Sequence, residues 1–317
     1  MQLAKAFESF VVEPIRHRRA GLVLYRLSQL LHDRTNGRFD TAFMRVAPRL
    51  RPKLSLPRYS GIAQDEFDST VAGLRDDGYK ILPTALPQAD ISELAAFAFS
   101  NPAYGNRLGD THSVTPDNVP GGIPRFTWPM RDLVRLPAMQ RIILEGPYCA
   151  IAQEYLGCRP VLAHATLWLD VPCEGRFEPY LYHYDNEGPG FLKFFFFLTD
   201  TGAGTGAHHF VAGSQTPTKP DAVARSGLYS DEEIFGAFSR DRELIAAGPA
   251  GTVLAEDTKG FHRGSKITHD YRLLMQLEFS VIDVPTEQEL ADPFPPFGVP
   301  NLDPGLASIT RKFYSRA

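Results

Sequence analysis

Two histidines and one aspartate have the types and spacing of metal ligands. His183 and Asp185 lie in the segment YHYD (residues 182–185), and His262 lies in GFHRG (residues 260–264). Two imidazoles and one carboxylate can hold non-haem Fe(II) from one side, which leaves the other side open for a co-substrate and O₂. Side chains two apart on a strand point to the same face, so His183 and Asp185 can reach one ion. His262 must come from a distant strand, as a β-barrel permits.

The surrounding sequence matters because a His-x-Asp triplet alone is common by chance. Residues 179–215 read PYLYHYDNEGPGFLKFFFFLTDTGAGTGAHHFVAGSQ. This segment resembles the phytanoyl-CoA dioxygenase-like branch of the Fe(II)/2-oxoglutarate oxygenases. The family pattern is His-x-Asp, an aromatic strand that begins with Leu-Lys and ends with Leu-Thr-Asp, a glycine turn and Val-x-Gly-Ser-His, followed by a distal His and an Arg. The resemblance extends from about residue 155 to Ile282, and Gln215 stands where the family usually has a histidine that is not a ligand.

The resemblance implies a fold, a set of cofactors and a reaction. The fold is mainly β with flanking helices (α+β), around a double-stranded β-helix core of the jelly-roll, cupin-like kind. Fe(II) is bound by His183, Asp185 and His262, with 2-oxoglutarate and O₂ as co-substrates. The activity is that of a dioxygenase that hydroxylates an unactivated C–H bond and releases succinate and CO₂. Its substrate is a small molecule, or is linked to a carrier or to CoA.

Arg272 and Lys193 are candidates for binding the carboxylates of 2-oxoglutarate. Arginine binds a carboxylate through paired hydrogen bonds and stays charged, and in the family an Arg at this distance beyond the distal His holds the far carboxylate. Lys193 lies inside an apolar strand, so it needs an anionic partner or, at a sheet edge, a route to water. Arg272 could instead share a solvent-exposed strand face with Gln276, Glu278 and Ser280.

Other polar side chains are candidates for the same pocket. His208 and His209 alternate along a strand, so one faces inward, where it could contact substrate or compete as a metal ligand. His164 and Trp168 share a strand face and could contact substrate, although packing in the core is the ordinary role of a strand tryptophan. Ser265 is a weaker candidate for the 2-oxoglutarate carboxylate, because the family's serine usually lies two residues after the distal histidine.

Two other classes of protein could use the same three ligands. One is a catalytically silent jelly-roll protein that binds a metal or another ligand. The other is a metal-dependent hydrolase that holds Zn²⁺ through His183, Asp185 and His262. A hydrolase has no need of Arg272 and Lys193 as a clamp for a distant carboxylate, so these two residues favour the oxygenase.

The apolar pattern predicts the elements that position these residues. Strands are expected at 161–171, 179–185, 190–199, 207–212, 251–255 and 271–282. The strand that contains Phe194–Phe197 is apolar on both faces, which is typical of a buried central strand. Helices are expected at 62–77, 87–100 and 137–157, the second with Asp90 as its N-cap. Residues 101–128 are expected to form a loop and 217–240 a helical insertion, and both could determine substrate specificity.

We expect an N-terminal extension over residues 1–60 and an oxygenase domain over 61–317, with a jelly-roll core from roughly 160 to 283. The extension holds 12 Lys and Arg and 4 Asp and Glu, a net charge of +8, whereas the whole chain has −4. It contains a basic helix with a leucine stripe over residues 21–33. We expect this stripe to pack on the catalytic domain; contact with a membrane surface or an acidic carrier is the alternative.

Composition indicates a soluble globular protein, with 22% charged residues in a chain of 317. No apolar run has the length of a transmembrane span, the first residues lack a secretory pattern, and no nucleic-acid partner is expected. The cysteines, Cys149, Cys158 and Cys173, are odd in number and form no C-x-x-C motif. Reduced thiols and a cytoplasmic location are therefore expected, which also suits Fe(II).

Overall fold

The computed structural model describes residues 20–57, 59–82, 86–105, 109–174, 178–283, 285 and 293–317. The first third of the expected N-terminal extension thus lies outside the described residues. The barrel strands are β5 (Val161–Asp170), β6 (Phe191–Phe197), β7 (His208–Val211), β8 (Glu243–Ala246), β9 (Val253–Glu256), β10 (His262–Gly264) and β11 (Arg272–Ser280).

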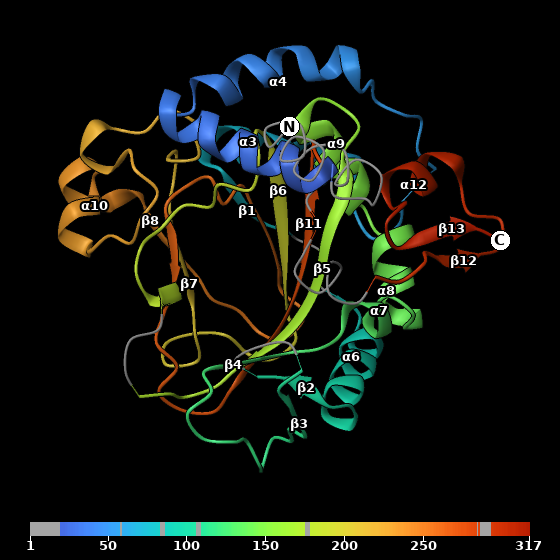
Figure 1. Cartoon of the computed structure of the whole chain (residues 1–317). Coiled ribbons are helices and arrows are strands. Elements are labelled where there is room, and N and C mark those ends of the chain that lie inside the picture. The colour runs from blue at the N-terminus through green and yellow to red at the C-terminus, as the bar shows by residue number, and fades with distance from the viewer. Residues whose placement is uncertain are drawn as a thin grey trace, which may run out of the picture.

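These strands divide between two sheets in the described part of the chain. The large sheet has the order β1-β9-β6-β11-β5-β4-β2-β3, and the small sheet has the order β10-β7-β8. The chain passes back and forth between the two sheets, which face each other in the centre of the molecule (Figure 1). The strands within both sheets are antiparallel. This arrangement is a jelly roll, so the predicted fold class, mainly β with flanking helices, is confirmed. The outer strands of the large sheet are β1 (Tyr79–Ile81), β2 (Ala103–Tyr104), β3 (Thr111–His112) and β4 (Arg125–Thr127).

The two central strands of the large sheet, β6 and β11, are buried along their whole length. Leu192, Phe194 and Phe196 join the main hydrophobic core on the outer side of the sheet, whereas Phe195 and Phe197 pack inside the barrel. Both faces of β6 therefore avoid water, as the phenylalanine run predicts. Neighbouring side chains on a strand point to opposite faces, so the inward positions of these strands are the ones that can form a site.

Helices cover the outer face of the large sheet. Apolar side chains from these helices fill the main core together with the outward residues of β5, β6 and β11. These helices are α5 (Gln64–Asp77), α6 (Gln88–Ser100), α7 (Met130–Leu133), α8 (Pro137–Gln140), a π-helical turn (Arg141–Glu145), α9 (Tyr148–Leu156) and α12 (Pro304–Ile309). Beside α12 lies a parallel pair of strands, β12 (Phe297–Val299) and β13 (Tyr314–Arg316). On the other side, α10 (Asp231–Ala237) lies next to the small sheet (Figure 1).

Several local predictions were wrong. Residues 179–185 contain a 3-10 turn (Glu178–Tyr180) and two isolated bridges, because Tyr182 pairs with Tyr229 and the next residue pairs with β10. Residues 101–128 contain β2, β3 and β4 and are not a plain loop. Pro87 is the N-cap residue of α6, and Asp90 lies inside the helix, where it is buried and bound to Arg141. Contacts with residues distant in the sequence determine the secondary structure at each of these positions, and the local sequence does not encode those contacts.

Two helices, α3 (Ala20–Thr35) and α4 (Arg38–Leu50), lie across one end of the barrel (Figure 1). The expectation that the leucine stripe of this region packs on the catalytic domain was wrong, because three leucines of α3 are exposed. The helix buries Ser28 and His32 instead. Polar contacts decide this orientation: His32 binds Asp40 of α4, and Gln29 binds the backbone of Asn186. Within the described residues, the structure contains no helix that is both long and apolar enough to cross a membrane.

Candidate metal centre and its surroundings

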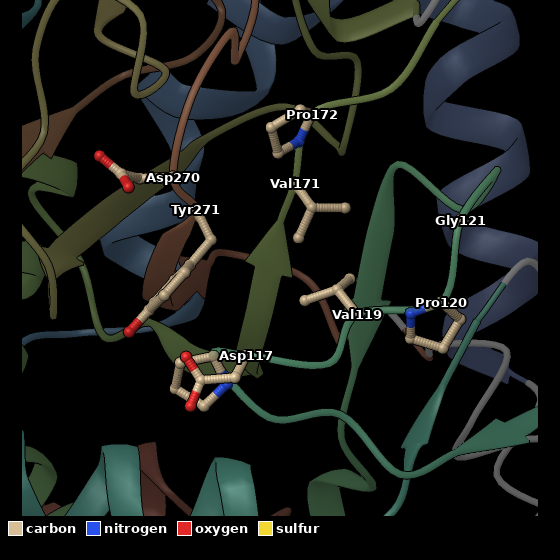
Figure 2. A pocket seen from close by; sticks show the side chains of 9 residues that line it. Asp117, Val119, Pro120, Gly121, Val171, Pro172, Asp270 and Tyr271 are labelled. Carbon is tan, nitrogen blue, oxygen red and sulfur yellow. The ribbon is translucent and has the colours of Figure 1, made fainter.

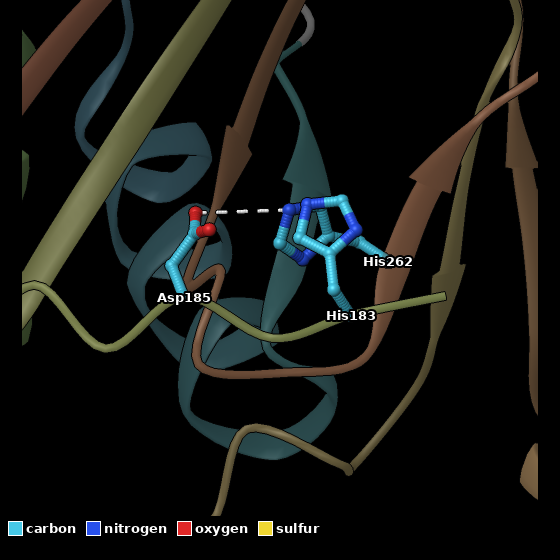
Figure 3. A group of neighbouring side chains, drawn as sticks. All are labelled: His183, Asp185 and His262. Carbon is cyan, nitrogen blue, oxygen red and sulfur yellow. Dashed lines mark ion pairs between the residues drawn. The ribbon is translucent and has the colours of Figure 1, made fainter. Parts of the chain in front are cut away.

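The three predicted ligands meet at one point at the edge of the small sheet. His183 and His262 form an isolated antiparallel bridge, with backbone N–O distances of 3.0 and 2.8 Å, and their rings are 4.4 Å apart. The backbone N–H of Asp185 donates to Thr258 at 2.8 Å, which turns its carboxylate towards the two rings (Figure 3). Asp185 Oδ2 lies 3.7 Å from His262 Nε2, and one ligand atom from each residue falls within 4.8 Å of the others.

The hydrogen bonds of the two imidazoles fix which nitrogen faces this point. Nδ1 of His183 lies 2.9 Å from the carbonyl of Leu181, and Nδ1 of His262 lies 2.9 Å from that of Gly260. Each Nδ1–H therefore donates to a backbone carbonyl, which leaves each Nε2 with a free lone pair for a metal. Burial lowers the pKa of His262 to about 4, so this ring is neutral at pH 7. The donor set and its orientation fit a divalent transition metal.

Lys193 lies against the carboxylate ligand. β6 is flanked by β9 and β11, so Lys193 is not an edge lysine that extends to water. Its Nζ is 2.7 Å from Asp185 Oδ2, 3.2 Å from Glu187 Oε1 and 3.7 Å from Glu278 Oε2. Burial alone would raise the pKa of Asp185, but the Lys193 ammonium, through its charge and its hydrogen bond, outweighs burial and holds this pKa well below its usual range. Asp185 is therefore ionised and held in place at neutral pH.

A row of ionisable residues crosses the inner face of the large sheet beside the metal centre. In register across four strands lie His164 of β5, Glu278 of β11, Lys193 of β6 and Glu256 of β9. Glu278 and Glu256 are fully buried. Together with Glu187, His164 and Glu278 form a second group with ligand atoms within 4.8 Å of one another. Sequence reasoning missed both glutamates, although each occupies an inward position in a strand whose other face is apolar.

His208 is the inward one of the two adjacent histidines. Its ring stacks on His262 at 5.5 Å, and its Nε2 is 2.8 Å from Glu256 Oε2. Burial lowers the pKa of His208 to about 3 and raises that of Glu256 to about 8, so both groups are neutral at pH 7. His209 points to the opposite side, where Nδ1 lies 2.7 Å from Glu243 and Nε2 lies 2.7 Å from the hydroxyl of Ser265. Ser265 is thus engaged away from the barrel interior.

Arg272 lies at the other end of β11, in a buried cluster of two cations and one anion. Its Nη2 is 2.5 Å from Asp170 Oδ2, and Nη1 donates to the carbonyl of Gly206. Arg125 Nε is 2.5 Å from the other oxygen of Asp170. Gly206 has φ +84°, and a Cβ there would lie 3.1 Å from the guanidinium, so this close approach requires glycine. The cluster has a net positive charge and can accept a further carboxylate.

The alternative placement of Arg272 on a solvent-exposed strand face is excluded. Arg272 is buried, as are the residues that share its face, Gln276, Glu278 and Ser280. Trp168 also points into the barrel, where it packs on Phe195 with a ring distance of 6.5 Å and lies 4.6 Å below the guanidinium of Arg125. Its Nε1 has no hydrogen-bond partner in the described part of the chain. The inward face thus runs from the metal centre through aromatic side chains to Arg272.

A surface pocket of about 330 Å³ adjoins the Arg272 end of the barrel. It lies between the loop around Asp117 and Val119 and the strand ends at Val171 and Tyr271 (Figure 2). Val171 and Tyr271 pack in the main core on the outer side of the sheet, whereas Asp170 and Arg272 point into the barrel, so the pocket and the cationic cluster lie on opposite faces of the same strand ends. The 101–128 segment reaches the cluster through Arg125, whereas His164 lies at the acidic end.

Comparison with solved structures finds the same fold in proteins of low sequence identity. EctD from S. alaskensis, crystallised with 2-oxoglutarate and 5-hydroxyectoine, superposes with a TM-score of 0.52 at 18% identity, over 73% of this chain and 82% of that one. The non-heme alpha ketoglutarate dependent epimerase SnoN from nogalamycin biosynthesis gives a TM-score of 0.50 at 17% identity, over 69% and 84%. No protein-family model and no curated protein sequence matches the chain. The superpositions show that the fold is shared, and at identities this low they show the fold alone.

Proposed function

We propose that the protein is an Fe(II)- and 2-oxoglutarate-dependent dioxygenase of the phytanoyl-CoA dioxygenase-like branch. The observation that carries this proposal is the convergence of His183, Asp185 and His262, with both Nε2 atoms directed to one point. The fold shared with EctD, crystallised with 2-oxoglutarate, and with the alpha ketoglutarate dependent epimerase SnoN supports it. The substrate class is a small molecule, free or linked as a thioester, and the reaction is hydroxylation of an unactivated C–H bond.

The residues around the centre have separate tasks in this proposal. Lys193 keeps Asp185 ionised and oriented, and the backbone carbonyls at 181 and 260 orient the two imidazoles. Arg272, with Arg125 beside it, binds the far carboxylate of 2-oxoglutarate. Phe195 and Phe197 line the barrel interior and exclude water. Iron and 2-oxoglutarate, when bound, supply oxidation by O₂ with release of succinate and CO₂.

We also propose that residues 61–317 form the catalytic unit and that the enzyme works in the cytoplasm. Cys149, Cys158 and Cys173 are free in the structure, and free thiols and Fe(II) both persist in a reducing compartment. His164, His208 and Trp168 are the proposed contacts for substrate, whereas Ser265, bound to His209, is no longer a favoured contact for 2-oxoglutarate.

The test is release of succinate from 2-oxoglutarate by the purified protein with Fe(II) and O₂, in parallel with ester and amide hydrolysis after loading with Zn²⁺. The proposal expects Fe(II)-dependent succinate release that is lost in His262→Ala. Hydrolysis without succinate release would show that the protein is a hydrolase and not an oxygenase. Metal binding with neither activity, even with a broad metabolite mixture, would indicate the silent binding protein.

A further inference from the structure

Helices α3 and α4 hold most of the exposed large apolar residues of the described chain. Leu24, Leu27 and Leu30 follow one another at intervals of three residues on α3, and their exposed fractions are 55%, 48% and 46%. Val46 and Leu50 add a second exposed pair on α4. The other exposed large apolar residues among those described are single ones on separate elements, namely Ile81, Leu228, Ile245 and Phe297. Isolated exposed residues are ordinary, whereas a gathered stripe marks an interaction surface.

The same two helices expose a strongly basic set of side chains. Their exposed charged residues are Asp33 and five arginines, Arg26, Arg34, Arg38, Arg45 and Arg49. The remaining acidic residue, Asp40, is buried and bound to Lys259 at 2.7 Å, so it does not offset this charge at the surface. Leucines beside arginines on an exposed helix are typical of a segment that lies in a membrane interface.

We propose that α3 and α4 dock the protein on the surface of an anionic lipid bilayer. The leucines would enter the boundary between headgroups and acyl chains, and the arginines would pair with lipid phosphates. Charge decides between lipid and a second copy of the chain, because a symmetric contact would place these arginines against each other. The proposal does not depend on the chemistry of the metal centre.

The inner faces of these helices connect the docking surface to the segments that carry the metal ligands. Gln29 of α3 donates to the carbonyl of Asn186 at 2.9 Å, and Asn186 directly follows Asp185. Lys259, which binds Asp40 of α4, also donates to the carbonyl of Gly188 at 2.7 Å and lies three residues before His262. Docking would therefore place the metal-bearing end of the barrel at the lipid surface, where an amphiphilic substrate could be met.

The test is co-sedimentation of the intact protein with vesicles of phosphatidylcholine alone and with about 30% phosphatidylglycerol. We expect binding to the anionic vesicles at about 0.1 M salt and its loss at about 0.5 M, since salt screens the attraction. The triple variant Leu24→Ser/Leu27→Ser/Leu30→Ser should bind at least about tenfold more weakly, and Arg45→Glu/Arg49→Glu should also lose binding. These side chains are exposed, so an unchanged melting temperature and circular dichroism spectrum should accompany both losses.

The controls are Ile245→Ser and Arg316→Glu, which change an exposed apolar and an exposed basic residue elsewhere. Both should bind vesicles as the unmodified chain does. Absence of vesicle binding, or equal losses in the control variants, would refute the proposal. A dimer in light scattering that dissociates in the triple leucine variant, without vesicle binding, would assign the stripe to a second copy. Binding that appears only after removal of residues 1–19 would assign it to the chain's own N-terminal segment.

Discussion

Arg272 shares Asp170 with Arg125, so two guanidinium groups face one carboxylate in a buried position. Asp170 balances one of the two guanidinium charges, so the cluster keeps one unbalanced positive charge for 2-oxoglutarate. Burial opposes ionisation of Asp170, but Arg125 and Arg272 keep its pKa below the usual value. The carboxylate of 2-oxoglutarate would thus join a preformed site, which reduces the free-energy cost of ordering the arginine on binding.

Arg272→Leu should weaken 2-oxoglutarate binding by about 2–5 kcal/mol, because it leaves the far carboxylate without its buried partner. Arg272→Lys should lose only part of that, since it keeps the charge but not the paired hydrogen bonds. The measurement is the apparent Kd of 2-oxoglutarate by calorimetry on Mn(II)-loaded protein. Arg263→Lys, which changes an arginine bound to Asp231 on α10, is the matched control. Unchanged affinity in both Arg272 variants would assign the role to another cation, with Arg125 as the first candidate because it binds the same Asp170.

Glu256 should make the metal-free protein less stable as the pH rises. Burial raises its folded-state pKa to about 8 from the ordinary 4.5, so between these values the folded chain holds a proton that the unfolded chain releases. This contribution falls by as much as roughly 1.4 kcal/mol per pH unit. It should show as a net loss of stability between about pH 6.5 and pH 8, because below that range His208 and His262, whose folded-state pKa values are lowered, contribute the opposite slope. Glu256→Gln stays neutral and should flatten this slope in urea unfolding, whereas the exposed Glu232→Gln should leave it unchanged. Equal slopes in all three proteins would contradict the assignment.

At the scale of the element, α4 is tied to the barrel by a buried ion pair. Asp40 accepts from Lys259 at 2.7 Å and from His32 at 2.8 Å, and all three side chains are buried. Asp40→Leu leaves the buried ammonium of Lys259 with the carbonyl of Gly188 as its hydrogen-bond acceptor among the described residues, so the free energy of unfolding should fall by about 3–5 kcal/mol. Asp40→Leu/Lys259→Met removes both charges and should cost clearly less. The double-mutant cycle by calorimetry checks this, and simple additivity of the two single changes would contradict it.

Elements with a strong local pattern were predictable, and those decided by pairing were not. β6 and β11 follow from their apolar runs, and α5 and α6 begin and end close to the predicted residues. β10 has three residues and the His183 bridge has one, so neither has a sequence pattern to find. The leucine stripe of α3 was assigned to the wrong environment, because a helix with both apolar and polar faces can bury either when specific polar partners exist.

The same distinction holds for the candidate site. His183, Asp185, His262 and Arg272 could be found from spacing and from the family resemblance. Glu187, Glu256 and Glu278 could not, since a single inward glutamate looks the same as an outward one until the strand register is known. The partner of Lys193 was expected to be a bound carboxylate, and the structure supplies three carboxylates from the chain itself.

For the molecule as a whole, the charge distribution matches the division into two ends of the barrel. Arg272 and Arg125 form a positive cluster at one end. Asp185 and Glu278 carry negative charge at the other end, beside Lys193, whereas burial and the nearby Glu278 raise the pKa of Glu187 well above its usual value. A divalent metal belongs at the acidic end and a dicarboxylate can extend from it towards the basic one. Binding of the two ligands should therefore be linked, because the metal offsets the negative charge that would otherwise repel 2-oxoglutarate.

This linkage predicts how the whole chain should melt. Mn(II), a redox-stable substitute for Fe(II), should stabilise the folded protein by about 2.7 kcal/mol at a concentration near 100 Kd, a rise in Tm of a few degrees. 2-Oxoglutarate should raise Tm further when Mn(II) is present and have little effect alone. In His183→Ala both increments should disappear, because the two remaining ligands hold the metal weakly, while the unliganded Tm stays close to that of the unmodified chain. Differential scanning calorimetry measures Tm without ligand, with Mn(II), with 2-oxoglutarate and with both. Stabilisation by 2-oxoglutarate without metal would show that its site is independent of the centre formed by His183, Asp185 and His262.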